Sequence, residues 1–305
     1  MPDQLQFYTV DAFTKQPFCG NPAAVIILPE SSDQTSFKVD DSLCQSIAAE
    51  FNLSETAYAT PIGGGDEREK VYEIKWFTPT SEISLCGHAT LAVSHVLFTH
   101  HHPQATSIRF ETRTRGHLIA RKNSEDSSIS LDFPSSSIVT LSEGHKRMDK
   151  ILEKLRKAVK EEDVQRIAWA DEVDAVVAEL SQDIDLPNLD FDPAVLGGIG
   201  NIVILTQPAP KDSPHDCYSR VFAPDIGVPE DPVTGAAHTA LAPFWLSSPS
   251  LSRLHQFPAI KESCTLRAKQ VSQRGGEIIV TFDKEKKRVE LRGWAREMMK
   301  GEISL

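Results

Sequence analysis

The sequence predicts an α/β (α+β) protein made of two similar halves, and three observations support this prediction. First, Cys86-Gly87-His88-Ala89 opens a segment whose apolar residues recur at helical spacing. Second, the pattern returns in the second half, where Thr234-Gly235-Ala236-Ala237 leads from a proline-rich turn into another apolar helix. Third, the 305 residues are twice the usual domain length of about 150 residues.

A second similarity supports the duplication. Gly20-Asn21 precedes a short apolar run in the first half, and Gly200-Asn201 precedes one in the second. We therefore interpret the two Gly-Asn pairs as equivalent strand starts. The expected domains are residues 1–125 and 126–305, with the last strand, about 289–305, returning to the first half.

The individual elements follow from local patterns. Residues 5–13 and 23–28 are predicted strands, residues 40–51 form a helix capped by Asp41 or Ser42, and a strand starts near Glu55. The glycines at 63–65 mark a hairpin tip. Further predictions are a hairpin at 107–119, a strand at 129–133, a charged amphipathic helix at 143–162, and strands at 218–223, 278–282 and 289–291.

Composition limits the function classes. Hydrophobic residues make up 40% and charged residues 25% of the chain, which is typical of globular proteins. A formal net charge of −11 argues against nucleic-acid or anionic-membrane partners. We expect neither a signal peptide nor a membrane span.

Cysteine and histidine usage indicates a metal-free protein of a reducing compartment. The five cysteines show no CxxC spacing, so we expect a cytoplasmic protein without a disulfide framework or zinc site. The run at 100–102 is predicted to be a polar loop and not a metal site, because consecutive residues do not share one face of a helix or strand. No cofactor is expected.

The two glycine-led helices suggest an anion site. At Gly87 and Gly235 no side chain keeps a ligand from the first backbone N–H groups, which carry the positive end of the helix dipole. If both helix starts line one cleft, they can hold a small carboxylate or phosphate. The alternative is a pair of core helices that begin with glycine for packing.

Two charged features have competing interpretations. Glu55 lies between small hydroxyl residues at a strand start, where it is either a catalytic carboxylate or a solvated loop residue. The helix at 143–162 is either a solvated surface element or a partner-binding surface.

The chain resembles the PhzF-like proteins of phenazine biosynthesis, within the diaminopimelate-epimerase fold group. The resemblance rests on short motifs spread over nearly the whole chain: Asp11-Ala12-Phe13, Gly20-Asn21-Pro22-Ala23-Ala24-Val25, Ser54-Glu55-Thr56, Trp76-Phe77-Thr78-Pro79, Leu85-Cys86-Gly87-His88-Ala89-Thr90, Gly198-Ile199-Gly200-Asn201, Phe222-Ala223-Pro224, Glu230-Asp231-Pro232-Val233-Thr234-Gly235 and Gly275-Gly276. The resemblance implies two α/β halves, each a curved, mostly antiparallel sheet wrapped around a central helix. It also implies an active site between the halves and a homodimer.

The resemblance also implies roles for individual residues. Glu55 is expected to be the general acid/base, with Gly87, His88 and Asp231 lining the substrate pocket. On its residues alone, His88 could equally be a capping or core histidine.

Two positions depart from relatives. Epimerases of this fold group place a cysteine at each glycine-helix junction, whereas this chain has Cys86 and Thr234. A threonine hydroxyl is too weak an acid for a two-thiol mechanism. Ala236 stands where a serine is common in the family, so the substrate need not be that of the phenazine enzyme.

The expected function is a cofactor-independent isomerase that moves a proton, and with it a double bond, in a small carboxylate. In this prediction Glu55, His88 and Asp231 are catalytic, and substrate contacts come from Cys86, Gly87, Thr234, Gly235 and Ala236. The alternatives are a two-base epimerase or racemase using Cys86, and a non-catalytic interaction protein that retains the fold.

Overall fold

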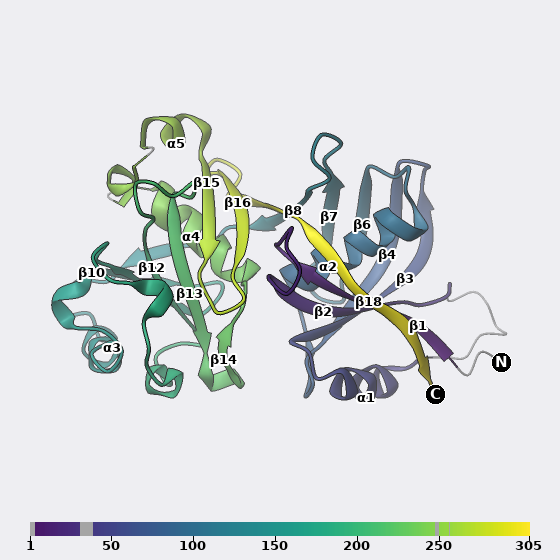
Figure 1. Ribbon diagram of the computed structural model, residues 1–305, viewed down its shortest axis with the longest axis horizontal. Helices are drawn as coiled ribbons and strands as arrows, with labels where there is room; N and C mark the ends of the chain where they lie inside the picture. Colours follow the sequence, from purple (N-terminus) through teal and green to yellow (C-terminus); the bar gives the residue numbers. More distant parts are fainter. Residues whose placement is uncertain (1–3, 31–38, 248–249, 256) are drawn as a thin grey trace. The chain divides into compact units, whose positions relative to one another are not determined.

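The computed structural model describes residues 4–30, 39–247, 250–255 and 257–305. The chain folds into two compact units: unit 1 is Met1–Asp132 with Arg292–Leu305, and unit 2 is Phe133–Leu291. Both are mixed α+β, with extensive sheet and few helices (Figure 1). Within the described ranges, every helix is too short or too polar to cross a membrane.

Unit 1 is built mainly of strands around one buried helix. Its strands are β1 (Gln4–Ala12), β2 (Asn21–Ile27), β3 (Glu55–Gly65), β4 (Glu69–Phe77), β5 (Glu82–Ile83), β6 (Ser107–Glu111), β7 (His117–Lys122) and β18 (Ala295–Ser304). Its helices are α1 (Asp41–Phe51), α2 (Gly87–Val96) and the π-helix η1 (Leu97–His101). Strands β8 (Ile129–Pro134) and β17 (Arg288–Gly293) carry the chain from one unit to the other.

Unit 2 has the same character. Its strands are β9 (Ile138–Thr140), β10 (Val164–Ala170), β11 (Ala175–Leu180), β12 (Ile202–Pro208), β13 (Cys217–Ala223), β14 (Val228–Asp231), β15 (Thr265–Gln270) and β16 (Gly276–Asp283). Its α-helices are α3 (Met148–Leu155), α4 (Gly235–Leu246) and α5 (Phe257–Ser263), and its 3₁₀ helices are η2 (Glu161–Asp163), η3 (Leu186–Asn188), η4 (Pro193–Leu196), η5 (Pro224–Ile226) and η6 (Ser250–Arg253).

The order and direction of strand pairing are the same in the two units. In unit 1 the order β1-β2-β3-β4-β6-β7 alternates antiparallel and parallel pairs. In unit 2 the order β10-β11-β12-β13-β15-β16 alternates identically. Strand β18 adds antiparallel to β1, as β9 does to β10. The predicted pair of pseudo-symmetric α+β halves is therefore confirmed.

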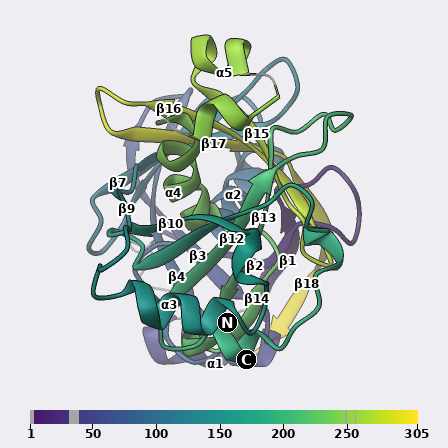
Figure 2. The same cartoon turned by 90° about the vertical axis from the view of Figure 1, so that its left-hand side faces the viewer.

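Each unit buries one glycine-led helix. Helix α2 packs against β1, β2, β3 and β18 (Figure 1). Eight of its residues are buried. Helix α4 of unit 2 (Figure 2) packs against β16 and β9. It is buried from Ala237 to Trp245. Apolar residues cover every face of both helices, which is the pattern of a helix enclosed by protein.

The repeated Gly-Asn pairs are not equivalent positions, contrary to our interpretation. Asn21 opens β2, whose counterpart in the pairing order is β11, whereas Gly200-Asn201 precedes β12, the counterpart of β3. Both pairs stand at the start of a strand, which needs a compact turn. The local similarity therefore reflects turn chemistry and not duplication.

Two local predictions need correction. The N-cap of α1 is Asp40, whose carboxylate accepts the Leu43 N–H at 2.9 Å, and not Asp41 or Ser42. The residues after α2 do not form a loop at once, because η1 continues to His101. The Tyr8 ring stacks on His100 of η1, and the Tyr72 hydroxyl contacts His102, the residue after η1.

The charged helix is much shorter than predicted. Within residues 143–162 only Met148–Leu155 is α-helical, and a separate 3₁₀ turn, η2, begins at Glu161. Its apolar stripe, Ile151 and Leu155 above all, packs into the core of unit 2, as does Val159 from the turns beyond the helix. Because β10 needs an extended chain from Val164, the helical pattern cannot continue to residue 162. The stripe is thus core and not a free partner-binding surface.

Candidate active site

Glu55 is the first residue of β3, where it pairs with Ala23 of the parallel strand β2. The following residue, Thr56, is fully buried, so the strand enters the core at once. The side chain of Glu55 retains 15% exposure. Glu55 is therefore a half-buried carboxylate fixed by the sheet and not the solvated loop residue of the alternative interpretation.

The start of α2 lies beside this carboxylate. Cys86 is the N-cap, with extended backbone and no capping side-chain hydrogen bond, and the first bond into the helix runs from the Thr90 N–H to the Cys86 carbonyl. The N–H groups of Gly87, His88 and Ala89 therefore have no acceptor within the helix. Together with the helix dipole they favour a negative charge at this end.

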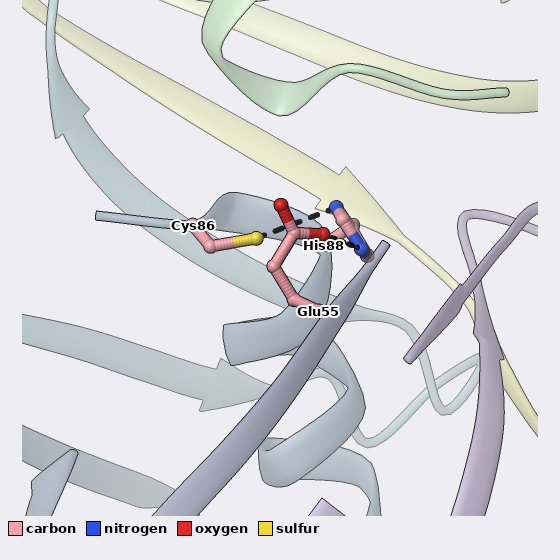
Figure 3. A group of neighbouring side chains, drawn as sticks. All are labelled: Glu55, Cys86 and His88. Carbon is pink, nitrogen blue, oxygen red and sulfur yellow. Dashed lines mark hydrogen bonds and ion pairs between the residues drawn. The ribbon is translucent and has the colours of Figure 1, made fainter. Parts of the chain in front are cut away.

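Glu55, Cys86 and His88 form one cluster (Figure 3). His88 Nε2 lies 2.9 Å from Glu55 Oε2, and His88 Nδ1 lies 3.4 Å from Cys86 Sγ. The imidazole is 5% exposed and thus enclosed by protein. The Glu55–His88 contact is an ion pair whose angle departs from that of a well-aligned hydrogen bond, so neither atom has a fully satisfied partner.

Asn21 is a further member of the cluster. Its Nδ2 lies 3.2 Å from His88 Nδ1, and its Oδ1 accepts the Ser54 hydroxyl at 3.3 Å. In this orientation Nδ1 accepts a hydrogen bond, which requires a neutral ring with its proton on Nε2. If the amide oxygen and nitrogen exchange places, Nδ1–H can donate to Asn21 and the ring can be an imidazolium. The orientation of Asn21 is thus linked to the charge of His88.

The electrostatics favour a charged ring. Burial works against an imidazolium, but Cys86 and Glu55 outweigh it and hold the pKa of His88 well above its ordinary value. Burial, followed by the nearby Glu55, raises the pKa of the Cys86 thiol. Because a neutral thiol carries no charge, we assign the stabilisation of the imidazolium to the Glu55 carboxylate. The pair then shares one transferable proton.

The same three side chains place potential metal-binding atoms within 4.8 Å of one another. Glu55 contacts one ring nitrogen of His88 and Cys86 contacts the other. One ion can bind only one nitrogen of a ring, so this arrangement suits a hydrogen-bonded proton-transfer group better than three ligands around a common centre.

The remaining predicted residues lie together at the start of α4 in unit 2. Asp231 ends β14, and the Thr234 hydroxyl donates a short hydrogen bond to its Oδ2. Thr234 is an extended N-cap like Cys86, followed by the buried Gly235 and the exposed Ala236. Gln270 fixes this turn, because its Oε1 accepts the Thr234 N–H at 2.9 Å and its Nε2 donates to the Asp231 carbonyl at 2.6 Å.

The buried imidazole of His238 also contacts the turn at the start of α4. Its Nδ1–H donates to the Thr234 carbonyl at 2.7 Å, and burial lowers its pKa to about 4. His238 is therefore neutral at physiological pH and fixes the N-cap residue.

Sequence reasoning did not assign a site role to Asn21, Ser54 or Gln270. Asn21 and Ser54 belong to the motifs that carry the family resemblance, so these motifs could have suggested them. Gln270 lies 36 residues from Thr234 in sequence and carries no motif. Only the fold brings it to the N-terminus of α4.

Fold and site together define a class: an α+β protein of two duplicated units, with a carboxylate–imidazole pair at the N-terminus of a buried helix. The model of the PhzC-PhzF family, phenazine biosynthesis-like protein, matches residues 10–301. The chain therefore belongs to this family.

Individual relatives agree over the whole length. An uncharacterized isomerase of Pseudomonas aeruginosa is 35% identical, with 99% of each chain covered. A phenazine biosynthesis-like domain-containing protein of Bos taurus is 33% identical, again with 99% of each chain covered. The crystal structure of a PhzF-family protein from Enterococcus faecalis has a TM-score of 0.77 at 30% identity, covering 99% of this chain and 100% of that one.

The fold extends to more distant proteins. A predicted epimerase from Pseudomonas aeruginosa has a TM-score of 0.65 at 15% identity, covering 99% of each chain. At this identity the likeness shows the fold alone. The predicted PhzF-like family is thus confirmed, and the fold is shared with a protein described as an epimerase.

Proposed function

We propose that the protein is an isomerase that moves a proton, and with it a double bond, in a small carboxylate. The observation that carries this proposal is the contact between Glu55 and His88 at the N-terminus of α2. A carboxylate held against an imidazole can accept a proton from one atom and return it to another. Relatives that are named isomerases support the same reaction class.

The proposed reaction needs only proton transfers. Glu55 takes a proton from a carbon adjacent to the substrate double bond, and the electrons of that C–H bond form a new double bond as the old one shifts towards the carboxylate. The three N–H groups of Gly87, His88 and Ala89 stabilise the negative charge that develops. Glu55, with His88 as a second proton carrier, then returns a proton to the other end of the delocalised system.

We extend the proposal to unit 2 through the family resemblance. Asp231 is proposed as a further catalytic residue, with Thr234, Gly235 and Ala236 as substrate contacts. The Thr234 hydroxyl and Gln270 restrict the rotamer and backbone of Asp231, which suits a group that must act with fixed geometry.

Hydrogen–deuterium exchange tests the function. Wild-type protein is incubated in D₂O with a panel of small unsaturated carboxylates, and deuterium incorporation is followed by NMR. We expect incorporation into at least one acid and a loss of about 10²- to 10⁴-fold in Glu55→Gln, the range for removal of a general acid/base. Exchange that is undiminished in Glu55→Gln removes this residue from the mechanism.

A two-base epimerase using Cys86 is the second candidate, and the contact between its sulfur and His88 favours it. Two observations oppose it: the thiol pKa is raised, and the corresponding N-cap of α4 is Thr234. Full exchange activity in Cys86→Ala excludes this candidate, whereas inactivity with retained folding supports it.

The assembly and location follow the family resemblance and the composition. We propose a homodimer in the cytoplasm that binds a small anionic substrate, without nucleic-acid or membrane partners. All five cysteines are free thiols, which suits a reducing compartment. Light scattering coupled to size-exclusion chromatography tests the dimer: a mass of one chain at working concentration would contradict it.

A further inference from the structure

Unit 2 contains a cavity of about 390 Å³ that includes none of the residues of the candidate active site. One wall is the turn from Gly198 to Asn201 together with the Trp169 ring. The start of α3 also lines it, with Lys146, Arg147 and Lys150. The volume is within the usual range for small-ligand sites, about 300–1,000 Å³.

The cavity lies at a position of unit 2 that corresponds to the Glu55 end of unit 1. Glu55 begins β3 and Asn21 begins the parallel neighbour β2. In unit 2 the counterparts of these strands are β12 and β11, which Asn201 and Asp174 precede. The Asn201 N–H donates to Asp174 Oδ2 at 3.2 Å. The duplicated fold thus places polar groups at the same ends of both parallel pairs.

The cavity has an excess of positive charge. Within the described parts of the chain, Lys146, Arg147 and Lys150 form no ion pair with a carboxylate, whereas Arg156 and Lys157 farther along both do. The Arg147 guanidinium lies 3.7 Å from the centroid of the Trp169 ring, which holds it against the cavity wall. In a chain of net charge −11, three such cations at one cavity favour an anionic ligand.

Two glycines, Gly198 and Gly200, leave room in the cavity beside these cations. Gly198 has φ +82°, a conformation that side chains rarely adopt, and a Cβ there would lie 3.5 Å from Lys150 Nζ. At Gly200 a Cβ would lie 3.0 Å from the Asp174 carbonyl oxygen and 3.3 Å from the Trp169 ring. Glycine at both positions therefore lets the backbone pass close to the cavity without filling it.

Two carboxylates, those of Asp174 and Asp225, add hydrogen-bond acceptors to the cavity. Asp225 Oδ2 accepts the Gly198 N–H at 2.6 Å, and Asp174 Oδ2 accepts the Asn201 N–H. The other oxygen of each carboxylate remains an acceptor, and hydroxyl groups are the neutral donors that suit it. The cavity thus combines three cations for an anionic group with two acceptors for hydroxyls.

From this combination we infer that the cavity binds a small phosphate monoester that carries hydroxyl groups, of the size of a sugar phosphate. A phosphate monoester offers close to two negative charges and three acceptor oxygens in a compact group, which matches Lys146, Arg147 and Lys150. Its hydroxyls bind Asp174 and Asp225. This ligand is distinct from the carboxylate proposed for the Glu55 site.

Isothermal titration calorimetry at low salt tests the inference, with glucose 6-phosphate as the probe and glucose, inorganic phosphate and malate as comparisons. The test variant is Lys146→Gln/Lys150→Gln, and the matched control is Lys154→Gln/Lys157→Gln, which removes the same charge outside the cavity. We expect saturable binding that weakens at least about tenfold in the test variant, as loss of two charge-assisted contacts implies. The control variant and Glu55→Gln should bind like the wild type.

Each other outcome overturns a defined part of the inference. No saturable heat, or equal weakening in test and control variants, overturns the site. Tighter binding of malate than of glucose 6-phosphate overturns the phosphate assignment. Equal binding of inorganic phosphate and glucose 6-phosphate overturns the role of the hydroxyls. Loss of binding in Glu55→Gln means that the probe occupies the candidate active site instead.

Discussion

Glu55 Oε2 and His88 Nε2 lie 2.9 Å apart, and within the described ranges neither atom has a better-aligned hydrogen-bond partner. A half-buried carboxylate and a buried imidazole thus face each other with one proton to share. Removing one partner of such a pair leaves the other as an uncompensated buried charge, which destabilises the folded state.

The charge of His88 predicts a pH-dependent stability. Its folded-state pKa is raised above the unfolded value of about 6.5, so the folded state binds the proton more tightly. This stabilisation is fully present below pH 6.5 and is lost as the pH rises through the folded-state pKa. Urea unfolding of wild type and His88→Gln should therefore show a free-energy difference that shrinks above pH 6.5. A difference that is constant with pH would contradict a charged ring.

Asn21 is predicted to be a positioning residue, because it contacts His88 without belonging to the ion pair. In Asn21→Ala the ring loses one of its two Nδ1 contacts and keeps the one to Cys86. We expect kcat for exchange to fall about tenfold or more, since small misplacements of catalytic groups are costly. The pH profile should shift as well. In Asn21→Asp the added carboxylate should move the profile to higher pH by favouring the imidazolium. Unchanged profiles in both variants would reduce Asn21 to a packing residue.

Ala236 is predicted to tune substrate choice. It is exposed at the second position of α4, so a hydroxyl added there disturbs no packing. Ala236→Ser should leave the melting temperature unchanged and alter KM for the best substrate by up to about tenfold, the effect of one ligand hydrogen bond. Ala236→Gly is the matched control without a hydroxyl. The same KM in both variants and the wild type would place position 236 outside the substrate site.

Asp40 is predicted to stabilise α1 as its N-cap. Asp40→Ala should reduce the free energy of unfolding by about 0.5–2 kcal/mol, because the Leu43 N–H loses its acceptor. Ser42→Ala, at the position that sequence reasoning favoured equally with Asp41, should change it by less than about 0.5 kcal/mol, as is usual for exposed residues. A larger effect at Ser42 than at Asp40 would reverse the assignment.

Much of the fold could be predicted because its signals are local. The glycine-led helices α2 and α4, the strand starting at Glu55 and the hairpin of β6 and β7 are all confirmed. The ends of α3 could not be predicted, because Val159 packs into the core from outside the helix. The N-cap of α1 could not be chosen from three adjacent polar residues, since capping depends on backbone geometry.

The candidate site also has residues that could be predicted from the sequence and residues that could not. Glu55, Cys86 and His88 were predicted and lie together, because motifs mark them. Asn21 is 67 residues from His88 in sequence, and no periodicity or spacing links the two. The cavity of unit 2 could not be predicted from the sequence. In the sequence, Lys146, Arg147 and Lys150 have the pattern of an ordinary solvated helix face.

Nitrogen-15 NMR of the histidine rings tests the central claim most directly, because it distinguishes imidazolium from neutral imidazole at each residue. At pH 7.5, above the ordinary histidine pKa of about 6.5, we expect imidazolium shifts for His88 in the wild type and neutral shifts in Glu55→Gln. A neutral His88 ring in the wild type, or a charged ring that persists in Glu55→Gln, would contradict the proton-sharing pair.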